Sequence, residues 1–275
     1  MIKNLARILK VLIITIWTAV CLLPIYFLLS TSFKTEADYG ANGIFPFPRK
    51  YIFSNYPDAL MHQSFLTYFK NSTIILVCSL SLLLIIALLA SYAFSRLMFK
   101  WNRPLHSFVV ACMAVPIHSV LISVYLLTRD IGLYDNIYGL IGPYVAFNLP
   151  ITIFILTSFM RDIPREMEES AEIDGCGKLQ SFFSIIVPLS KAGIVTVAIY
   201  DGIGMWNEFT FVLILTESSK NHTLPFSLWT YLGMFSNNVP MLFTVLVLSV
   251  IPMVIAFAIG QDKLVKGMMA GALKG

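Results

Sequence analysis

Six apolar segments place the strongest limit on how this chain can fold. Each is long enough to cross the roughly 30 Å hydrocarbon layer of a bilayer as a helix that rises about 1.5 Å per residue. We therefore predict an all-α integral membrane protein with six transmembrane helices. The predicted spans cover residues 11–29, 72–94, 105–127, 140–160, 192–215 and 241–260.

The composition agrees with a chain that is largely solvated by lipid. Of the 275 residues, 12% are charged, about half the roughly 25% of an ordinary soluble domain, and 57% are hydrophobic. The mean hydropathy is +0.79. These values exclude a soluble globule. The basic residues form no dense stripe, which argues against nucleic-acid binding, and the four cysteines lack the CxxC spacing of a metal or redox site.

The first apolar segment has two interpretations. Three basic residues precede it, as they do in a cleaved secretory signal. The apolar run nevertheless continues past Cys21 to Leu29, and Val20 is a poor small residue for a cleavage site. We predict that the segment is an uncleaved span.

Basic residues are distributed unevenly between the segments that connect the spans. The N-terminus, the loops 95–104 and 161–191, and the C-terminal tail hold 13 of the 19 Lys and Arg residues, and the segments on the other side hold 6. Because basic loops stay in the cytoplasm, both termini are predicted to be cytoplasmic. The sequence shows no internal repeat, so we predict a single membrane domain over residues 1–275.

The cytoplasmic loop 161–191 is unusually acidic. Five carboxylates lie within nine positions, at Glu166, Glu168, Glu169, Glu172 and Asp174. Pro164 suits the first turn of a helix, and the acids favour the positive end of that helix. Gly175 suits its end. We predict a short surface helix, a turn and an amphipathic stretch that re-enters the bilayer at Pro188. The alternative is a solvated connector.

A motif in this loop resembles the EAA motif of ABC-importer permeases. The family form is E-A-A, three residues, G, nine residues and I-x-L-P. This chain has Glu169-Ser170-Ala171, then Gly175, then Ile185-Ile186-Val187-Pro188, and departs from that form at Ser170 and Val187. Further stretches resemble the carbohydrate-uptake branch, in particular the smaller permease of maltose-type importers: Asn71-Ser72, 91–96, 132–134, Trp206-Asn207-Glu208-Phe209 and 271–275.

The resemblance implies a fold, partners and a coupling site. It implies the ABC-importer permease fold in a bacterial-type inner membrane, a second permease as heterodimer partner, two ATPase subunits and an extracytoplasmic solute-binding protein. ATP and Mg²⁺ would bind to the ATPase subunits. This chain lacks a phosphate-binding loop and is expected to hold no cofactor, metal or catalytic residue. In the family the short helix of the loop docks in an ATPase cleft. The residues implied here are Glu168, Glu169, Ser170, Ala171, Asp174, Gly175 and Pro188.

Polar residues also interrupt the fifth predicted span. A carboxylate at the bilayer centre costs at least about 2–3 kcal/mol, so such groups face protein or water. The spacing of Asp201, Gly204 and Glu208 predicts one helical face. Together with Trp206 and Asn207, these carboxylates either line a sugar pathway or hold helices together by hydrogen bonds, and both interpretations stay open.

The segment 216–240, between the last two predicted spans, is a third candidate. It exceeds the two to eight residues that a plain connector between helices needs. A polar first part is followed by an amphipathic stretch, 224–232, suited to the membrane surface. In the maltose-importer family the corresponding loop reaches into the opened binding protein, and the alternative is a helix that caps the bundle. The contact residues implied are Ser218, Ser219, Lys220, Asn221 and Ser236.

The sequence is compatible with several functions. The resemblance favours a permease subunit of an ATP-driven sugar importer, with an oligosaccharide first and glycerol phosphate or another polyol as alternatives. The competing mechanism is an ion-coupled secondary transporter with Asp201 and Glu208 as proton carriers, but the sequence has no inverted repeat. A membrane-embedded enzyme is disfavoured, because no His/Asp/Glu or Ser/His set has usable spacing.

Overall fold

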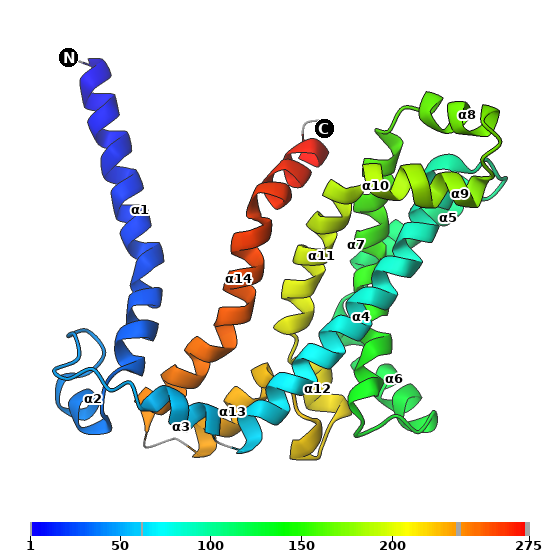
Figure 1. Cartoon of the computed structure of the whole chain (residues 1–275). Coiled ribbons are helices and arrows are strands. Elements are labelled where there is room, and N and C mark those ends of the chain that lie inside the picture. The colour runs from blue at the N-terminus through cyan, green and yellow to red at the C-terminus, as the bar shows by residue number, and fades with distance from the viewer. Residues whose placement is uncertain (1, 62, 235–237, 273–275) are drawn as a thin grey trace. The chain divides into compact units, whose positions relative to one another are not determined.

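The computed structural model describes residues 2–61, 63–234 and 238–272, and these ranges are helical without any β-strand. The first half contains α1 (Ile2–Ser32), α2 (Glu36–Asn42), α3 (Asn55–Met61), α4 (Gln63–Arg96), α5 (Asn102–Ala111), η1 (Cys112–Ala114), α6 (Ile117–Asp130) and η2 (Ile137–Leu140) (Figure 1). The second half contains α7 (Ile141–Arg161), α8 (Glu166–Ile173), α9 (Lys178–Ser181), the π-helix η3 (Phe182–Ile186), α10 (Val187–Leu189), α11 (Lys191–Trp206), α12 (Thr210–Leu215), η4 (Ser219–Asn221), α13 (Leu224–Met234) and α14 (Val239–Ala272).

Four helices of the described chain are long and apolar enough to cross a membrane alone, and two bent helix pairs qualify if each counts as one span. The single spans are Arg7–Ser32, Ser64–Arg96, Ile137–Arg161 and Val239–Gln261. The bent pairs are Asn102–Ala114 with Ile117–Asp130, at 100°, and Lys178–Leu189 with Lys191–Trp206, at 71°. An all-helical membrane protein with four to six spans is thus confirmed. The number six and the cytoplasmic termini remain predictions.

Two predicted spans are not the unbroken helices that we expected. The third, 105–127, breaks at Pro116, whose ring holds the preceding Val115 in an extended conformation with ψ 114°. The fifth, 192–215, is also interrupted, because α11 ends at Trp206 and α12 starts at Thr210. The second break moves Glu208 out of the helix that carries Asp201, so the prediction of one shared helical face is wrong.

The chain packs as two compact units. The first comprises Met1–Thr67 and Ser227–Pro252, and the second comprises Tyr68–Phe226 and Met253–Gly275. Three helices, α4, α13 and α14, contribute residues to both. The single membrane domain predicted over residues 1–275 stays a prediction.

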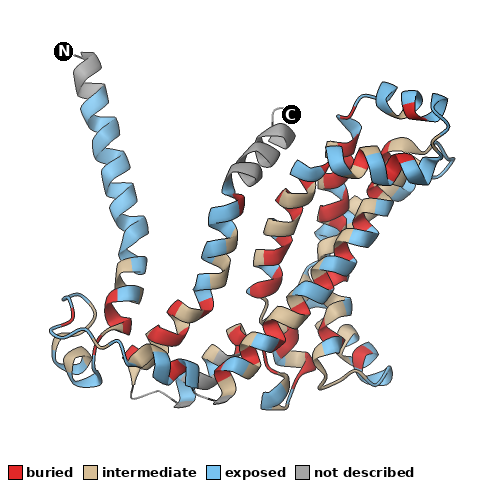
Figure 2. Ribbon diagram, in the orientation of Figure 1, coloured by how far each residue is buried: buried red, intermediate tan, exposed pale blue. Residues whose placement is uncertain are grey.

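In the first unit, a buried cation organises the segment that follows α1. The side chain of Lys34 is fully buried, and its Nζ donates to the carbonyl of Gly43 at 2.7 Å. Asn55 donates to the carbonyls of Ser32 and Lys34, and the hydroxyl of Thr244 in α14 also donates to Ser32. The apolar side chains of α1 are largely exposed (Figure 2), as expected for a helix that faces lipid or another chain.

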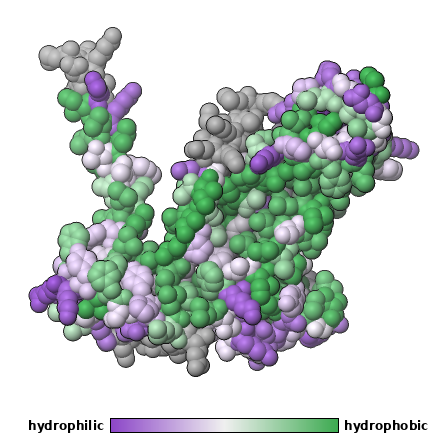
Figure 3. All heavy atoms as spheres, in the orientation of Figure 1, coloured by the Kyte–Doolittle hydropathy of each residue, from purple (hydrophilic) through white to green (hydrophobic). Residues whose placement is uncertain are grey.

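In the second unit, α4, α7 and α11 form the core. Leu83 and Ala87 of α4 and Leu156 of α7 are fully buried. Gly193 lets α11 approach α7 closely, because a Cβ at this position would lie 2.6 Å from the ring of Phe159. Figure 3 shows hydrophobic side chains along the long helices of this unit and hydrophilic ones gathered toward its ends, as a bilayer requires.

Candidate functional site

The acidic loop forms the short helix and turn that its sequence predicts. Glu166, Glu168 and Glu169 occupy the first turn of α8, where carboxylates stabilise the positive end of the helix. Gly175 follows with φ 86°, a left-handed conformation suited to glycine, and the N–H of Cys176 closes the turn on the carbonyl of Ala171 at 2.9 Å.

An ion pair joins this helix to the end of α4. The Nε of Arg96 lies 3.1 Å from Oε2 of Glu168, and the two side chains are only 5% and 14% exposed. Arg96 also donates through Nη2 to the carbonyl of Ile163 at 2.7 Å. Removal of either partner from a pair so shielded would leave a buried charge unpaired, which costs more than the loss of a surface pair does. Sequence analysis missed Arg96 as a site residue. The available signal was its place at the end of the motif stretch 91–96, on the same predicted cytoplasmic side as the five carboxylates of the acidic loop.

The remainder of the loop packs beneath α8. Phe182 and Ile186 of the π-helix η3 are buried against Met160 and Ile163, at the end of α7. Pro188 lies in α10, directly before the 71° bend into α11. The loop is therefore attached to three of the long helices, α4, α7 and α11.

The exposed face of α8 carries the other predicted coupling residues. Glu169, Ser170 and Asp174 are exposed, and Ile173 is 87% exposed beside them. Ala171 faces inward and is buried. The helix thus presents carboxylates and the large apolar side chains of Met167 and Ile173 to the outside, while its inner side is fixed to the bundle.

The polar residues of the interrupted fifth span make contacts inside the second unit. Asp201 is fully buried and accepts a hydrogen bond at 2.8 Å from the hydroxyl of Thr152, in α7. Trp206 is buried and packs edge-to-face on Phe69. Asn207 is exposed, and its amide donates back to the carbonyl of Ile203.

Glu208 stabilises the short helix that follows the break. Its Oε1 accepts from the N–H of Phe211 at 2.9 Å, as a residue preceding a helix does, and its Oε2 accepts from the hydroxyl of Tyr144 at 3.0 Å. Asp201 and Glu208 therefore both connect α7 to other elements of the same chain. This geometry supports the helix-packing interpretation for the two carboxylates.

Asp135 fastens the polar part of the 216–240 segment. Its Oδ1 accepts from the N–H groups of Glu217 and Ser218 at 2.9 and 2.8 Å and from the side-chain amide of Asn221 at 3.1 Å. The hydroxyl of Ser218 donates to Oδ2, and Asn221 also donates to the carbonyl of Asp135. We call this set of contacts the Asp135 staple.

The staple has two physical signatures. Asp135 has φ 52°, a conformation that Asp and Asn tolerate better than other side chains. Burial raises the pKa of its carboxyl, but the hydrogen bonds from Ser218, Glu217 and Asn221 outweigh that effect and hold the pKa well below its usual range. The carboxylate is thus ionised at neutral pH. Because its partners lie more than 80 positions away, no local pattern in the sequence indicates it.

The same segment is fixed to the first turns of α4. The amide of Asn71 donates to the carbonyls of Lys220 and His222 at 2.8 and 2.9 Å, and the hydroxyl of Ser72 accepts from the N–H of Leu224. Among the predicted contact residues, Ser219 and Lys220 are exposed, whereas Ser218 and Asn221 are partly buried. Ser236 lies outside the described residues.

The helix α4 separates the two loops. Asn71 holds the 216–240 segment, and Arg96, 25 residues later, holds the acidic loop. At about 1.5 Å per residue these attachments lie roughly 38 Å apart, which exceeds the hydrocarbon thickness of a bilayer. Among the described residues, no three His, Cys, Asp or Glu side chains group as a metal site.

Comparison with known proteins connects these features to a transport family. Residues 83–269 match the family described as binding-protein-dependent transport system inner membrane component. The chain is 45% identical over 262 residues to a putative ABC transporter permease protein of Caldicellulosiruptor sp. (strain Rt8B.4), with 95% of each covered. It is 33% identical to the sulfoquinovosyl glycerol transport system permease protein SmoH of Agrobacterium fabrum, over 92% of this chain and 89% of that one. The melibiose/raffinose/stachyose import permease protein MelC of Bacillus subtilis is 31% identical, over 92% and 91%.

Two solved structures share the fold. A chain of a bacterial ABC transporter that imports the acidic polysaccharide alginate superimposes with a TM-score of 0.83 and 23% identity, over 94% of this chain and 96% of that one. A chain of an alginate transporter in complex with its pentasaccharide-bound periplasmic protein gives a TM-score of 0.70 and 12% identity, over 94% of each. The chain therefore belongs to the binding-protein-dependent transport system inner membrane component family, which confirms its resemblance to the permeases of the carbohydrate-uptake branch.

Proposed function

We propose that this chain is a membrane-spanning permease subunit of an ATP-driven, binding-protein-dependent sugar importer. It forms the translocation pathway with a second permease, and two ATPase subunits supply the energy. ATP and Mg²⁺ bind to those subunits, so this chain acts as a transport subunit rather than an enzyme. The observation that carries the proposal is α8, an exposed acidic helix whose inner side is anchored to the bundle.

The construction of α8 suits the transmission of movement. The buried Arg96–Glu168 pair and the packed π-helix oblige α8 to move together with the ends of α4 and α7. A rigid element seated in a partner's cleft converts closure of that partner into rotation of the helices that bear it. Because the exposed face is acidic, we infer that the ATPase cleft offers basic groups to Glu169 and its neighbours.

Orientation follows from the two loops and the charge distribution. The loop 161–191 contains four Lys and Arg residues besides its acids. By the positive-inside rule, it is cytoplasmic together with the N-terminus, the loop 95–104 and the C-terminal tail. The staple and Ser219 then lie on the outer side, roughly 38 Å away along α4. In this proposed orientation, Ser219 and Lys220 are exposed on the outer side, which supports the proposal that they contact the solute-binding protein.

The substrate proposal rests on relatives. SmoH is named for sulfoquinovosyl glycerol and MelC for melibiose, raffinose and stachyose. We propose an oligosaccharide for this chain, with glycerol phosphate or another polyol as the alternative. An ion-coupled mechanism is disfavoured, because Asp201 and Glu208 are both engaged by partners in the protein.

The direct test is sugar-stimulated ATPase activity of the complex reconstituted with its binding protein, across a panel of oligosaccharides, glycerol phosphate and polyols. Glu169→Lys should abolish most of the stimulation by opposing the basic cleft. Glu36→Lys is the matched control, since it reverses an exposed carboxylate in the first turn of α2. Normal stimulation with Glu169→Lys, or uptake driven by a proton gradient without ATP, would refute the proposal.

Contact with the binding protein is tested separately. A single cysteine at Ser219 should cross-link to the binding protein when ATP is trapped in the complex. A cysteine at the exposed Lys50 of the first unit serves as the control for random collision. Failure of Ser219→Cys to cross-link in the trapped state, with transport intact, would leave the segment with a capping role.

A further inference from the structure

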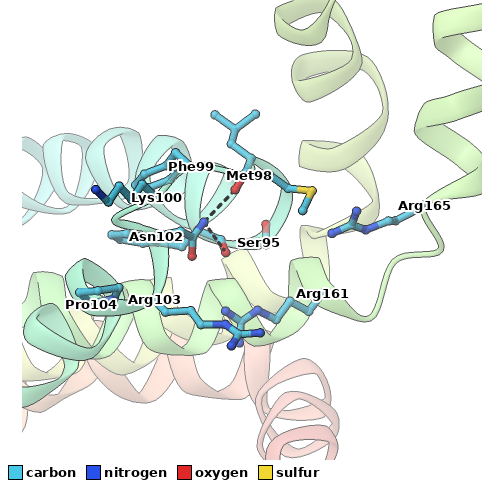
Figure 4. A pocket seen from close by; sticks show the side chains of 11 residues that line it. Ser95, Met98, Phe99, Lys100, Asn102, Arg103, Pro104, Arg161 and Arg165 are labelled. Atoms are coloured by element: carbon cyan, nitrogen blue, oxygen red, sulfur yellow. Dashed lines mark hydrogen bonds between the residues drawn. The ribbon is translucent and has the colours of Figure 1, made fainter.

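A cationic pocket lies beside the root of the acidic loop. Its volume is about 640 Å³, and it is lined by the turn between α4 and α5, the first residues of α5 and the end of α7 (Figure 4). Four of its lining residues carry positive charge, namely Lys100, Arg103, Arg161 and Arg165, and its lining includes no carboxylate. The mechanism proposed above does not use this pocket.

The four cations have no ionic partner in the part of the chain that the structure describes. The ion pairs there join Arg96 to Glu168 and Arg129 to Asp130. Figure 4 shows Arg103 of α5 and Arg161 of α7 reaching toward each other, and Arg165 reaching in from the connection to α8. Cations gathered without a counter-ion repel one another, and an anion between them would relieve that repulsion.

Carboxylates occur in an adjoining pocket of about 550 Å³ rather than in this one. That pocket shares Ser95, Arg161 and Arg165 with the first and adds Asp162 and Glu166. Arg165 also lines a third pocket, which contains Glu168, Glu169 and Glu172. The carboxylates of this region thus line the adjoining pockets, and the described lining of the first pocket carries positive charge alone.

The rim of the pocket is apolar and exposed. Met98 and Phe99 line it, and Met98 is 91% exposed. Trp101, Leu105 and Phe108 continue this surface along α5, and all three are exposed. Tryptophan at this position is typical of the membrane–water interface, where one side of a residue is wet and the other contacts lipid. The pocket thus combines a cationic interior with an apolar exterior.

We propose that this pocket binds the phosphate head group of an anionic phospholipid, with the acyl chains along the apolar surface of α5. The site lies in the cytoplasmic leaflet, a placement that rests on the orientation proposed above. A basic pocket between spans on that side is suited to anionic head groups. A free phosphate would satisfy the cations but would leave the apolar rim without a partner.

Occupancy should affect coupling, because the pocket reaches the root of α8. Arg165 directly precedes α8, and Arg161 ends α7. A head group held between Arg103 and Arg161 would join α5 to α7 just where the acidic loop begins. Anionic lipid is therefore expected to raise stimulated ATPase activity without contacting the ATPase subunits.

Lipid retention on the intact complex is the primary test. The importer is reconstituted in nanodiscs of phosphatidylcholine with phosphatidylglycerol, and retained lipid is quantified by native mass spectrometry. The double variant Arg103→Gln/Arg161→Gln should retain at least about tenfold less phosphatidylglycerol, since each basic contact near a membrane contributes about fivefold. Arg103→Lys/Arg161→Lys should restore most of the retention, which shows that charge rather than folding is responsible.

Controls separate this site from general attraction and from the proposed function. Lys50→Gln/Lys70→Gln removes two exposed cations elsewhere and should leave retention unchanged. Added inorganic phosphate should not displace the lipid. Equal retention by the Gln variant and the native protein, displacement by phosphate, or a complex that retains no phosphatidylglycerol would overturn the proposal. Binding-protein-stimulated ATPase activity in phosphatidylcholine alone reports on the proposed function independently.

Discussion

Removal of the Asp135 staple should release the outer segment without unfolding the spans. Four hydrogen bonds end on this carboxylate, from Glu217, Ser218 twice and Asn221. A hydrogen bond to a charged group contributes about 1.5–3 kcal/mol when shielded from water. Asp135 is partly exposed, so we take less than 1 kcal/mol for each and about 3 kcal/mol for the set.

Two substitutions separate the contribution of the charge of Asp135 from that of its hydrogen-bond acceptors. Asp135→Asn tolerates the left-handed backbone but replaces a charged acceptor with a neutral one. Because hydrogen bonds to a charged group are roughly twice as strong as neutral ones, this substitution should destabilise the closed segment by about 1.5 kcal/mol. Asp135→Gly adopts φ 52° without strain and removes every side-chain acceptor, so it should cost about 3 kcal/mol. The local opening of the segment should become roughly tenfold and one-hundredfold more favourable, respectively.

Hydrogen exchange of the complete complex measures this opening through the amides of Glu217 and Ser218. Exchange should accelerate in the order native, Asn, Gly, while Ser219→Ala, which removes an exposed neighbouring hydroxyl, leaves it unchanged. The concentration of binding protein that gives half-maximal ATPase stimulation should rise in the same order. Exchange rates that agree within about twofold across the series would refute the staple.

The pH dependence of the staple has a definite sign. The pKa of Asp135 is lower in the folded protein than the roughly 3.9 of an unfolded chain. The stabilisation it provides is therefore present above about pH 4 and is lost as the pH falls through the folded-state value. Exchange at Ser218 should thus show no contribution from Asp135 between pH 5 and 8, beyond the ordinary chemical rate.

Three further outcomes are expected. Gly175→Val places a β-branched residue at φ 86°, which costs at least about 1–2 kcal/mol. It should lower stimulated ATPase activity while insertion and assembly stay normal, and Cys176→Ala is the neighbouring control. Arg96→Gln leaves Glu168 shielded and unpaired at a cost of about 3 kcal/mol, so protease cleavage within 164–178 should increase, and Arg96→Lys should restore protection in part. Asp201→Asn keeps an acceptor for Thr152 and should retain assembly and transport, whereas Asp201→Leu removes that acceptor and should reduce assembly. Loss of transport with normal assembly in the Asp201→Asn variant would instead favour a pathway role for this carboxylate.

Features that depend on neighbouring residues could be predicted from the sequence. The apolar runs indicate the spans, and the acids and Gly175 indicate α8 and its turn, because each acts within a few positions of itself. The sequence predicts Pro164 in the first turn, but this residue precedes α8, which starts at Glu166 after the N-cap Arg165. Contacts between distant positions could not be predicted in this way. Arg96 and Glu168 are separated by 72 positions, and any of the nearby acids was an equally good partner by sequence.

The break after Trp206 shows a different limit. Its apolar flanks read as one continuous span, because hydropathy averages over a window and does not register where a carboxylate points. In the structure, Glu208 reaches forward and accepts from the N–H of Phe211, in the first turn of the new helix α12. The same polar residues therefore indicate both a candidate pathway and the start of a helix, and the sequence alone does not distinguish the two.

Burial then decides which polar residue of this region is available to a solute. A carboxylate in hydrocarbon is tolerated where the protein provides a partner, and Asp201 and Glu208 each have one. A residue that lines a pathway must instead keep capacity for water or sugar. Asn207 is exposed, and its donation to Ile203 leaves the amide oxygen and a second N–H for other partners. If this subunit supplies a sugar contact from the 201–208 stretch, we therefore expect it to come from Asn207 rather than from the carboxylates.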